Sequence, residues 1–284
     1  MDFLKIERNI DNYDKCFKNI ANELIKNYHL IVNKQKFAIA EVEFYLKTRK
    51  HSDPYIHGDE LQKNIGMWYF HRQNNGNYKG GTFKGLDITF GDEHKHTRGG
   101  ILIRSIVPVD KKNNLKMDEI IDGPCNVVNK IIELTSEHHD ETVAGLVGAL
   151  TKREQPSCTK KSLLYLVESS PRNVRIYRSP RIGLTLKSGD TSDKIDFVMK
   201  NYRFLIHPNI LKKNKFATIL YYNLHHNVDE EQLSTLFDIK VANLNKYIES
   251  FEEGKQLDGY EEFENKTLSV GDQCKLYGYC STLE

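Results

Sequence analysis

Two glutamates and a tyrosine alternate along one apolar segment of the chain. Residues 37–46 read FAIAEVEFYL, so Glu41, Glu43 and Tyr45 share one face if the segment is an extended strand. Two carboxylates on one face repel each other unless they lie in water, at an edge or in a site. The pattern has two interpretations. One is a solvated strand face, and the other is a site in which one carboxylate activates water while the ring packs on a planar substrate.

Three other features could serve such a site. Arg104 interrupts the apolar segment RGGILIRSI at 98–106, and a buried or half-buried arginine needs a partner, which indicates a site or a phosphate. The glycines of GGTFKGLDITFG at 80–91 precede a strand, where they allow either close approach of a phosphate or an ordinary hairpin. His57 lies in a polar loop, which taken alone predicts a surface histidine.

Positive charge is concentrated in one later segment. The whole chain has a net charge of only +2 and a pI of about 8.1, so the distribution of charge matters more than its sum. Residues 170–187 contain no acidic side chain. This segment predicts contact with a polyanion, the alternative being a solvated basic hairpin. Its arginines are Arg172, Arg175, Arg178 and Arg181.

Composition limits the class of protein. The chain has 284 residues, of which 39% are hydrophobic and 28% charged, which suits a packed core and excludes a disordered chain. No apolar run is long enough to cross a bilayer, and the N-terminus does not resemble a secretory signal. The five cysteines include no CxxC pair, and the pairs His94/His96 and His138/His139 lack a third ligand at suitable spacing. We therefore expect an intracellular protein in a reducing compartment, with no membrane partner and no metal.

The periodicity of apolar residues predicts an α+β fold. No βαβ rhythm recurs, so a curved, mainly antiparallel sheet with flanking helices is expected. We divide the chain into an N-terminal helical segment (1–34), a catalytic domain (35–208) and a helical extension packed on that domain (209–284). Within the extension, residues 229–254 predict either a helix-turn-helix or a plain helical hairpin. Strands are expected at 37–46, 86–91, 100–109, 163–167, 174–178, 181–186 and 202–206, and helices at 3–27, 124–132 and 140–150.

The order of the motifs over residues 35–207 resembles the alkyladenine (3-methyladenine) DNA glycosylase family. That order runs from a Glu-x-Glu-x-Tyr strand through a histidine loop, a glycine-rich strand entry and an arginine in the next strand to a Gly-Pro helix start and an Arg-Ile-Gly segment. Here these are Glu41/Glu43/Tyr45, His57 with Gly66-Met67-Trp68, Gly81 to Thr89, Arg104, Gly123-Pro124 and Arg181-Ile182-Gly183.

The resemblance implies a fold, an activity and roles for residues. The fold would be alkyladenine glycosylase-like, also described as formyltransferase-C-terminal-like. The activity would be that of a monofunctional, monomeric DNA-repair enzyme of base excision, which flips a modified base out of double-stranded DNA and hydrolyses its N-glycosidic bond without cofactor or metal, leaving an abasic site. Glu43 would be the general base that activates water, Tyr45 and His57 would contact the flipped base, and Arg104 would support the catalytic site.

The chain departs from the family pattern at three places. Where the family inserts a tyrosine into the gap left by the flipped nucleotide, this chain has Gly80, so that ring is either missing or supplied by Phe83 or the aromatic stretch 68–70. A second stacking tyrosine slightly upstream is also lost, with Asn77 or Tyr78 nearby. A pocket asparagine of the family is replaced by Asp87, which predicts a different or bulkier base, unless Asp87 merely pairs with Lys84 or Arg104. Lys84 joins the four arginines as an expected DNA contact. Two alternatives stay open: an N-glycoside hydrolase acting on RNA or a nucleoside-like substrate, and a non-catalytic nucleic-acid-binding module.

Overall fold

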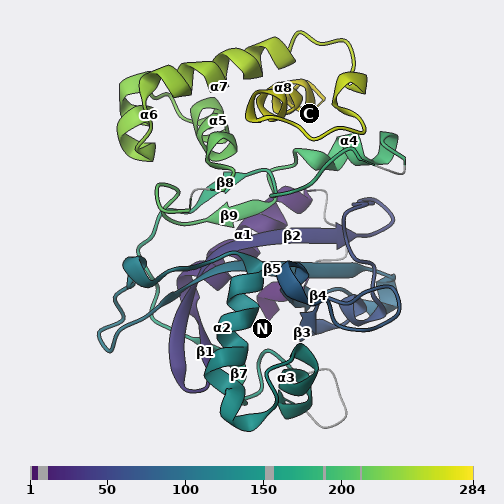
Figure 1. The fold of residues 1–284 in the computed structure, drawn as a ribbon, viewed down its shortest axis with the longest axis vertical. Helices are drawn as coiled ribbons and strands as arrows, with labels where there is room; N and C mark the ends of the chain where they lie inside the picture. The colour runs from purple at the N-terminus through teal and green to yellow at the C-terminus, as the bar shows by residue number, and fades with distance from the viewer. Residues whose placement is uncertain (1, 6–11, 151–156, 188–189, 212, 284) are drawn as a thin grey trace. The chain divides into compact units, whose positions relative to one another are not determined.

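The structure is a computed structural model that describes residues 2–5, 12–150, 157–187, 190–211 and 213–283. It is an α+β protein with a mostly antiparallel sheet, as the sequence predicts (Figure 1). The chain forms two compact units. The sheet unit comprises residues 1–52 and 56–174, and the helical unit comprises residues 53–55 and 175–284.

Six strands of the sheet unit pair in the order β3-β4-β5-β2-β1-β7, each antiparallel to its neighbours. The short strand β6 pairs with β5. The bounds are β1 (Tyr28–Val32), β2 (Gln35–Lys47), β3 (Ile65–Phe70), β4 (Leu86–Phe90), β5 (Arg98–Pro108), β6 (Ile121–Asp122) and β7 (Leu164–Glu168).

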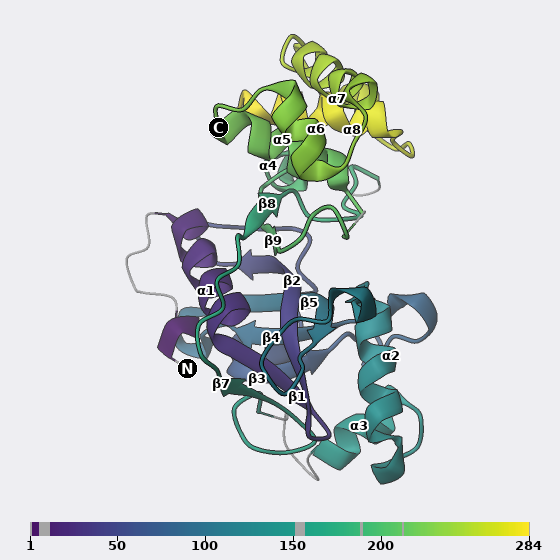
Figure 2. The same cartoon turned by 90° about the vertical axis from the view of Figure 1, so that its left-hand side faces the viewer.

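Helices flank this sheet on both sides (Figure 2). Helix α1 (Tyr13–Asn27) packs on the apolar face of β2, where the Phe17 ring stacks on Phe44 with ring centroids 4.8 Å apart. Helix α2 (Pro124–Thr135) begins with a proline at its first turn, a position where no backbone N–H is needed. It buries four aliphatic residues at helical spacing and is followed by α3 (Val143–Leu150). Because α1 covers the apolar face of β2, the polar residues described below lie on the opposite face of that strand.

The helical unit contains five helices and one pair of short strands among its described residues. Strand β8 (Tyr177–Ser179) pairs with β9 (Arg203–Leu205). The helices form two adjoining apolar clusters. They are α4 (Ser192–Val198), α5 (Lys215–His225), α6 (Glu230–Phe237), α7 (Val241–Gly254) and α8 (Val270–Ser281).

Several elements differ from the sequence prediction. Residues 28–32 form a strand within the predicted N-terminal helical segment, and part of the predicted helix 3–27, residues 6–11, lies outside the described residues. Residues 181–186 form a turn rather than a strand, because Arg181 points inward to an acidic partner. The units divide the chain after residue 174 rather than after 208, because β8 and β9 pair with each other inside the helical unit.

Candidate functional site

A row of four residues crosses the sheet unit on the polar face of β2. The strand register places Glu43 opposite Leu102 on β5, Leu102 opposite Asp87 on β4, and Asp87 opposite Tyr69 on β3. Residues that are directly opposite in an antiparallel sheet point to the same face. The row therefore brings two carboxylates onto one side of the sheet, with Leu102 between them.

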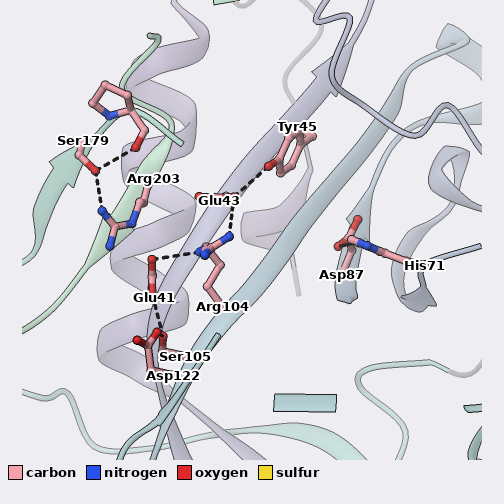
Figure 3. A network of polar contacts seen from close by, with 11 residues as sticks. Glu41, Glu43, Tyr45, His71, Asp87, Arg104, Ser105, Asp122, Ser179 and Arg203 are labelled. Atoms are coloured by element: carbon pink, nitrogen blue, oxygen red, sulfur yellow. Dashed lines mark hydrogen bonds and ion pairs between the residues drawn. The ribbon is translucent and has the colours of Figure 1, made fainter. Parts of the chain in front are cut away.

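A buried cluster surrounds Glu43 (Figure 3). The Arg104 Nε atom donates a hydrogen bond to Glu41 Oε1 at 3.1 Å, and Nη1 donates to Glu43 Oε2 at 3.4 Å. The Tyr45 hydroxyl donates to the same Glu43 oxygen at 2.8 Å. The Ser105 hydroxyl lies 2.6 Å from Glu41 Oε2 and 3.0 Å from Asp122 Oδ1. The cluster thus assembles around one guanidinium.

Burial decides between the two interpretations of the strand. Glu43 is 0% exposed, Glu41 1% and Arg104 6%, so the solvated-face interpretation is wrong. Burial alone would lower the pKa of Arg104, but the charges of Glu43 and Glu41 outweigh it and raise that pKa above its ordinary value. The guanidinium therefore stays charged and compensates the buried carboxylates.

Asp87 belongs to a second polar cluster that includes a histidine the sequence analysis missed. The carboxylate bonds His71 Nε2 through Oδ1 at 2.8 Å and accepts from Gln62 Nε2 through Oδ2 at 3.4 Å. Lys84 instead donates to Asn129 Oδ1 at 2.5 Å, so neither predicted partner of Asp87 is the observed one. Asp87 is 2% exposed, and both of its carboxylate oxygens take part in hydrogen bonds.

The position of Asp87 depends on a glycine in the neighbouring strand. A Cβ atom added at Gly100 would lie 2.5 Å from Asp87 Oδ2 and 2.8 Å from Gln62 Nε2. Gly100 is directly opposite Tyr45 on β2, so the Asp87 carboxylate leans over β5 toward the Tyr45 strand. Any larger side chain at this position would displace the acid.

His57 packs against this second cluster. Its ring meets His71 edge-on at a centroid distance of 4.2 Å and lies 6.0 Å from the ring of Tyr69. Burial of the ring, followed by the effect of His71, lowers the pKa of His57 to about 4. A neutral His57 can accept a hydrogen bond from Lys79, whose Nζ lies 3.0 Å from Nε2. The structure thus places His57 beside Asp87 and His71.

Solvent exposure distinguishes the aromatic residues that could fill the gap left by a flipped nucleotide. Phe83 ends the short 3₁₀ turn Gly81–Phe83 and is 75% exposed. The alternative stretch is internal, because Trp68, Tyr69 and Phe70 are at most 2% exposed and belong to the core. Only Phe83 of these four residues presents a ring to solvent.

The arginine-rich segment does not present all its charges to solvent. Arg181 is 2% exposed and forms a buried ion pair with Asp53, with Nη1 2.5 Å from Oδ2, so its guanidinium is directed to an acidic partner inside the helical unit. Arg172 donates to the backbone oxygens of Ile25 and Tyr28 at the end of α1, and burial lowers its pKa to about 10.

The two remaining arginines are more accessible. Arg175 is exposed and donates to the Tyr222 hydroxyl at 3.0 Å. Arg178 is half-buried, donates to the backbone oxygen of Asn201 at 2.8 Å and lies over the ring of Phe204 at 4.9 Å. Arg175 is therefore the better of the two for contact with a phosphate.

Metal ligands and membrane spans can be described only for the part of the chain that the structure covers. Among residues 2–5, 12–150, 157–187, 190–211 and 213–283, no three His, Cys, Asp or Glu side chains are placed to share a metal ion. In the same part of the chain, no helix is both long and apolar enough to span a membrane.

Fold and site together define an α+β protein with a buried carboxylate–arginine cluster on an antiparallel sheet. No protein-family model matches the chain. The chain is 35% identical over 217 residues to "Uncharacterized protein L759" of Acanthamoeba polyphaga mimivirus, an alignment that covers 72% of this chain and 92% of the viral protein. The chain belongs to the family of this mimivirus protein.

Proposed function

We propose that the protein is a DNA glycosylase of alkyladenine glycosylase-like fold, which hydrolyses the N-glycosidic bond of a flipped, modified base. The observation that carries this proposal is the Glu43 carboxylate, which is fully buried yet bonded to Arg104 and Tyr45. This arrangement aims two hydrogen-bond donors at one carboxylate oxygen, which holds the group in the fixed position that a general base requires.

The chemistry assigned to this cluster is one proton transfer and one displacement. Glu43 accepts a proton from water, and the water oxygen bonds to the sugar carbon C1′ as the bond from C1′ to the base breaks. Arg104 keeps the carboxylate charged and oriented, and Tyr45 holds one of its oxygens. The proton on Glu43 then returns to solvent, so the carboxylate is regenerated.

Duplex DNA is the proposed partner because of Phe83. Enzymes that act on a base must extrude it from the stack, and apolar side chains often occupy the opened base step. Phe83 offers an exposed ring on a short turn, and Lys84 follows it directly with a cationic group suited to a phosphate.

The experiment is a base-release assay with the full-length protein. Duplex oligonucleotides that each carry one modified base are incubated with the enzyme, abasic sites are cleaved with alkali, and the free base is identified by mass spectrometry. Release from duplex DNA, absent with a Glu43→Gln preparation made in parallel, supports the proposal. Release from RNA alone would indicate the RNA-directed hydrolase, and tight binding without release from any substrate would indicate a non-catalytic binding module.

A further inference from the structure

The sheet unit has a surface cavity of about 530 Å³ that the proposed water-activating cluster does not use. Its lining comes from the turn at 76–80, from Lys84, from Ile132 of α2 and from residues 141–144 at the start of α3. This volume lies within the roughly 300–1,000 Å³ that is typical of small-molecule sites. We infer that the cavity is a second binding site, which takes a nucleotide with its base beside Tyr78 and its phosphate beside Lys84.

An aromatic ring and apolar side chains form part of this lining. Ile132 and Val143 are both buried, and the half-buried Tyr78 also lines the cavity. The Arg72 guanidinium lies over the Tyr78 ring, 5.0 Å from its centroid, and Arg72 Nη2 donates to the Tyr78 hydroxyl at 3.2 Å. Arg72 occupies one face of the ring, so a planar group would stack on the other. Any nucleobase can do so, because every base has a π face.

Backbone pairing holds Tyr78 in its position. Arg72 lies opposite Tyr78 in an antiparallel bridge, and the Lys79 N–H donates to the oxygen of His71 at 2.9 Å. The chain reverses at Gly76, whose φ of +84° is a conformation that favours glycine. The returning arm of this turn therefore has a fixed course along the cavity.

Two lysines give the lining its positive charge. Lys84 Nζ donates to Asn129 Oδ1 at 2.5 Å, and this amide is neutral. Lys79 Nζ lies 3.0 Å from His57 Nε2, and burial lowers the pKa of His57 to about 4, so this ring is also neutral near pH 7. Within the described part of the chain, neither lysine pairs with a carboxylate, and Glu141 is the one acidic residue of the lining. The lining is thus net positive, which suits a phosphate group.

The nucleotide could come from a DNA strand or from solution. Phe83 precedes Lys84 and is 75% exposed, so a DNA strand in contact with the Phe83 ring would pass next to Lys84. A base displaced from that strand would carry its own phosphate to the cavity. A free mononucleotide offers the same base and phosphate, so binding experiments must separate the two sources.

The test fills the cavity without changing its charge. Ala144 is an exposed residue of the lining in the first turn of α3, so Ala144→Trp should fold normally and place an indole in the cavity. Ala149→Trp, at an exposed alanine of the same helix outside the lining, is the matched control. Isothermal titration calorimetry with full-length protein measures the binding of dAMP, deoxyadenosine and 2-deoxyribose 5-phosphate. The wild type and Ala149→Trp should bind dAMP more tightly than either half of it, and Ala144→Trp should lose this binding.

Two further variants separate the base from the phosphate. Lys84→Gln should raise the dissociation constant of dAMP about tenfold or more, as expected for the loss of a charged hydrogen bond, and should leave that of deoxyadenosine unchanged. Tyr78→Leu should weaken the binding of both ligands at least about fivefold, because it removes the stacking ring. Lys112→Gln, at an exposed lysine of the same unit, is the control for charge and should change neither.

A duplex with one extrahelical adenosine, compared with the fully paired duplex by fluorescence anisotropy, tests the second source. If dAMP does not bind, but the extrahelical nucleotide strengthens duplex binding in Ala149→Trp and not in Ala144→Trp, the site takes a nucleotide of a DNA strand. Should Ala144→Trp fold poorly, Tyr78→Leu and Lys84→Gln decide with the same probes.

The inference is overturned if Ala144→Trp binds both probes as the wild type does. It is also overturned if the wild type prefers neither dAMP to its halves nor the extrahelical duplex to the paired one. None of these measurements requires release of a base, so failure of this site and failure of the glycosylase function are separate results.

Discussion

Replacing Arg104 by methionine tests whether one guanidinium holds the buried site together. The substitution keeps an apolar stem of similar length and removes the charge that bridges Glu41 and Glu43. Both carboxylates are at most 1% exposed, so bulk solvent screens their charges poorly once the guanidinium is gone. The variant must therefore either bury uncompensated charge or unfold more readily.

The magnitude follows from the geometry. Breaking a buried ion pair by removing one partner costs about 3–5 kcal/mol, and Arg104 serves two carboxylates. That is a large part of the stability of a typical domain, about 5–15 kcal/mol. Adding Glu41→Gln and Glu43→Gln to the Arg104 variant should recover part of the loss, because neutral amides need no cation.

Urea unfolding followed by tryptophan fluorescence measures the change in unfolding free energy of the sheet unit. Trp68 is the single tryptophan of the chain, is 0% exposed and lies in the sheet unit with Arg104. Arg98→Met is the matched control, because Arg98 pairs with Glu60, whose side chain is 70% exposed, and its loss should change the unfolding free energy little. The reasoning is refuted if Arg104→Met costs no more than Arg98→Met.

Three further predictions concern acid sensitivity and the arginine-rich segment. His29 is 4% exposed, and burial, followed by the charge of Arg172, lowers its pKa to about 4 from 6.5. As the pH is lowered, the imidazole of His29 therefore takes up a proton in the unfolded chain before it does so in the folded one. The unfolding free energy of the sheet unit should fall by about 1.4 kcal/mol for each pH unit as the pH decreases from 6.5 to 4. His29→Leu should flatten this dependence in urea titrations at several pH values, and an unchanged slope would exclude His29 as its cause. Arg175→Gln should make the plot of log K for DNA binding against log salt concentration shallower by a slope of about 0.9, the amount for one phosphate contact. Arg181→Gln should instead lower the unfolding free energy by about 3–5 kcal/mol, because it leaves Asp53 unpaired. Fluorescence anisotropy at several salt concentrations and thermal unfolding separate these two effects, and an unchanged salt slope for Arg175→Gln would place the DNA contact elsewhere.

Local patterns in the sequence predicted much of the fold. The alternation of 37–46 correctly placed Glu43 and Tyr45 on the face opposite the apolar one, since side-chain direction in a strand follows from spacing alone. The helix that begins at Pro124 and the two helices within 229–254 were also predicted correctly, because their apolar residues repeat at helical spacing. These features depend only on neighbours along the chain.

Partners that are distant in sequence could not be predicted in the same way. Arg181 looked like a surface cation because Asp53, its buried partner, lies 128 residues away. The contact of His71 with Asp87 was missed because the two residues meet across the β3–β4 hairpin, 16 residues apart in sequence. The available signal was that His71 lies two residues after Tyr69, and alternate residues of an extended strand share a face. Register, which the sequence does not show, decides which polar groups meet.

The central claim is that the Glu43 carboxylate activates the water that breaks the N-glycosidic bond. Single-turnover release of a modified base from duplex DNA, measured with Glu43→Gln and with the matched surface variant Glu60→Gln, tests it most directly. We expect Glu43→Gln to keep the fold and DNA binding and to slow release on the order of 10²–10⁴-fold, because an amide cannot accept the proton of water, while Glu60→Gln retains the wild-type rate. Release by Glu43→Gln at the wild-type rate would contradict the claim.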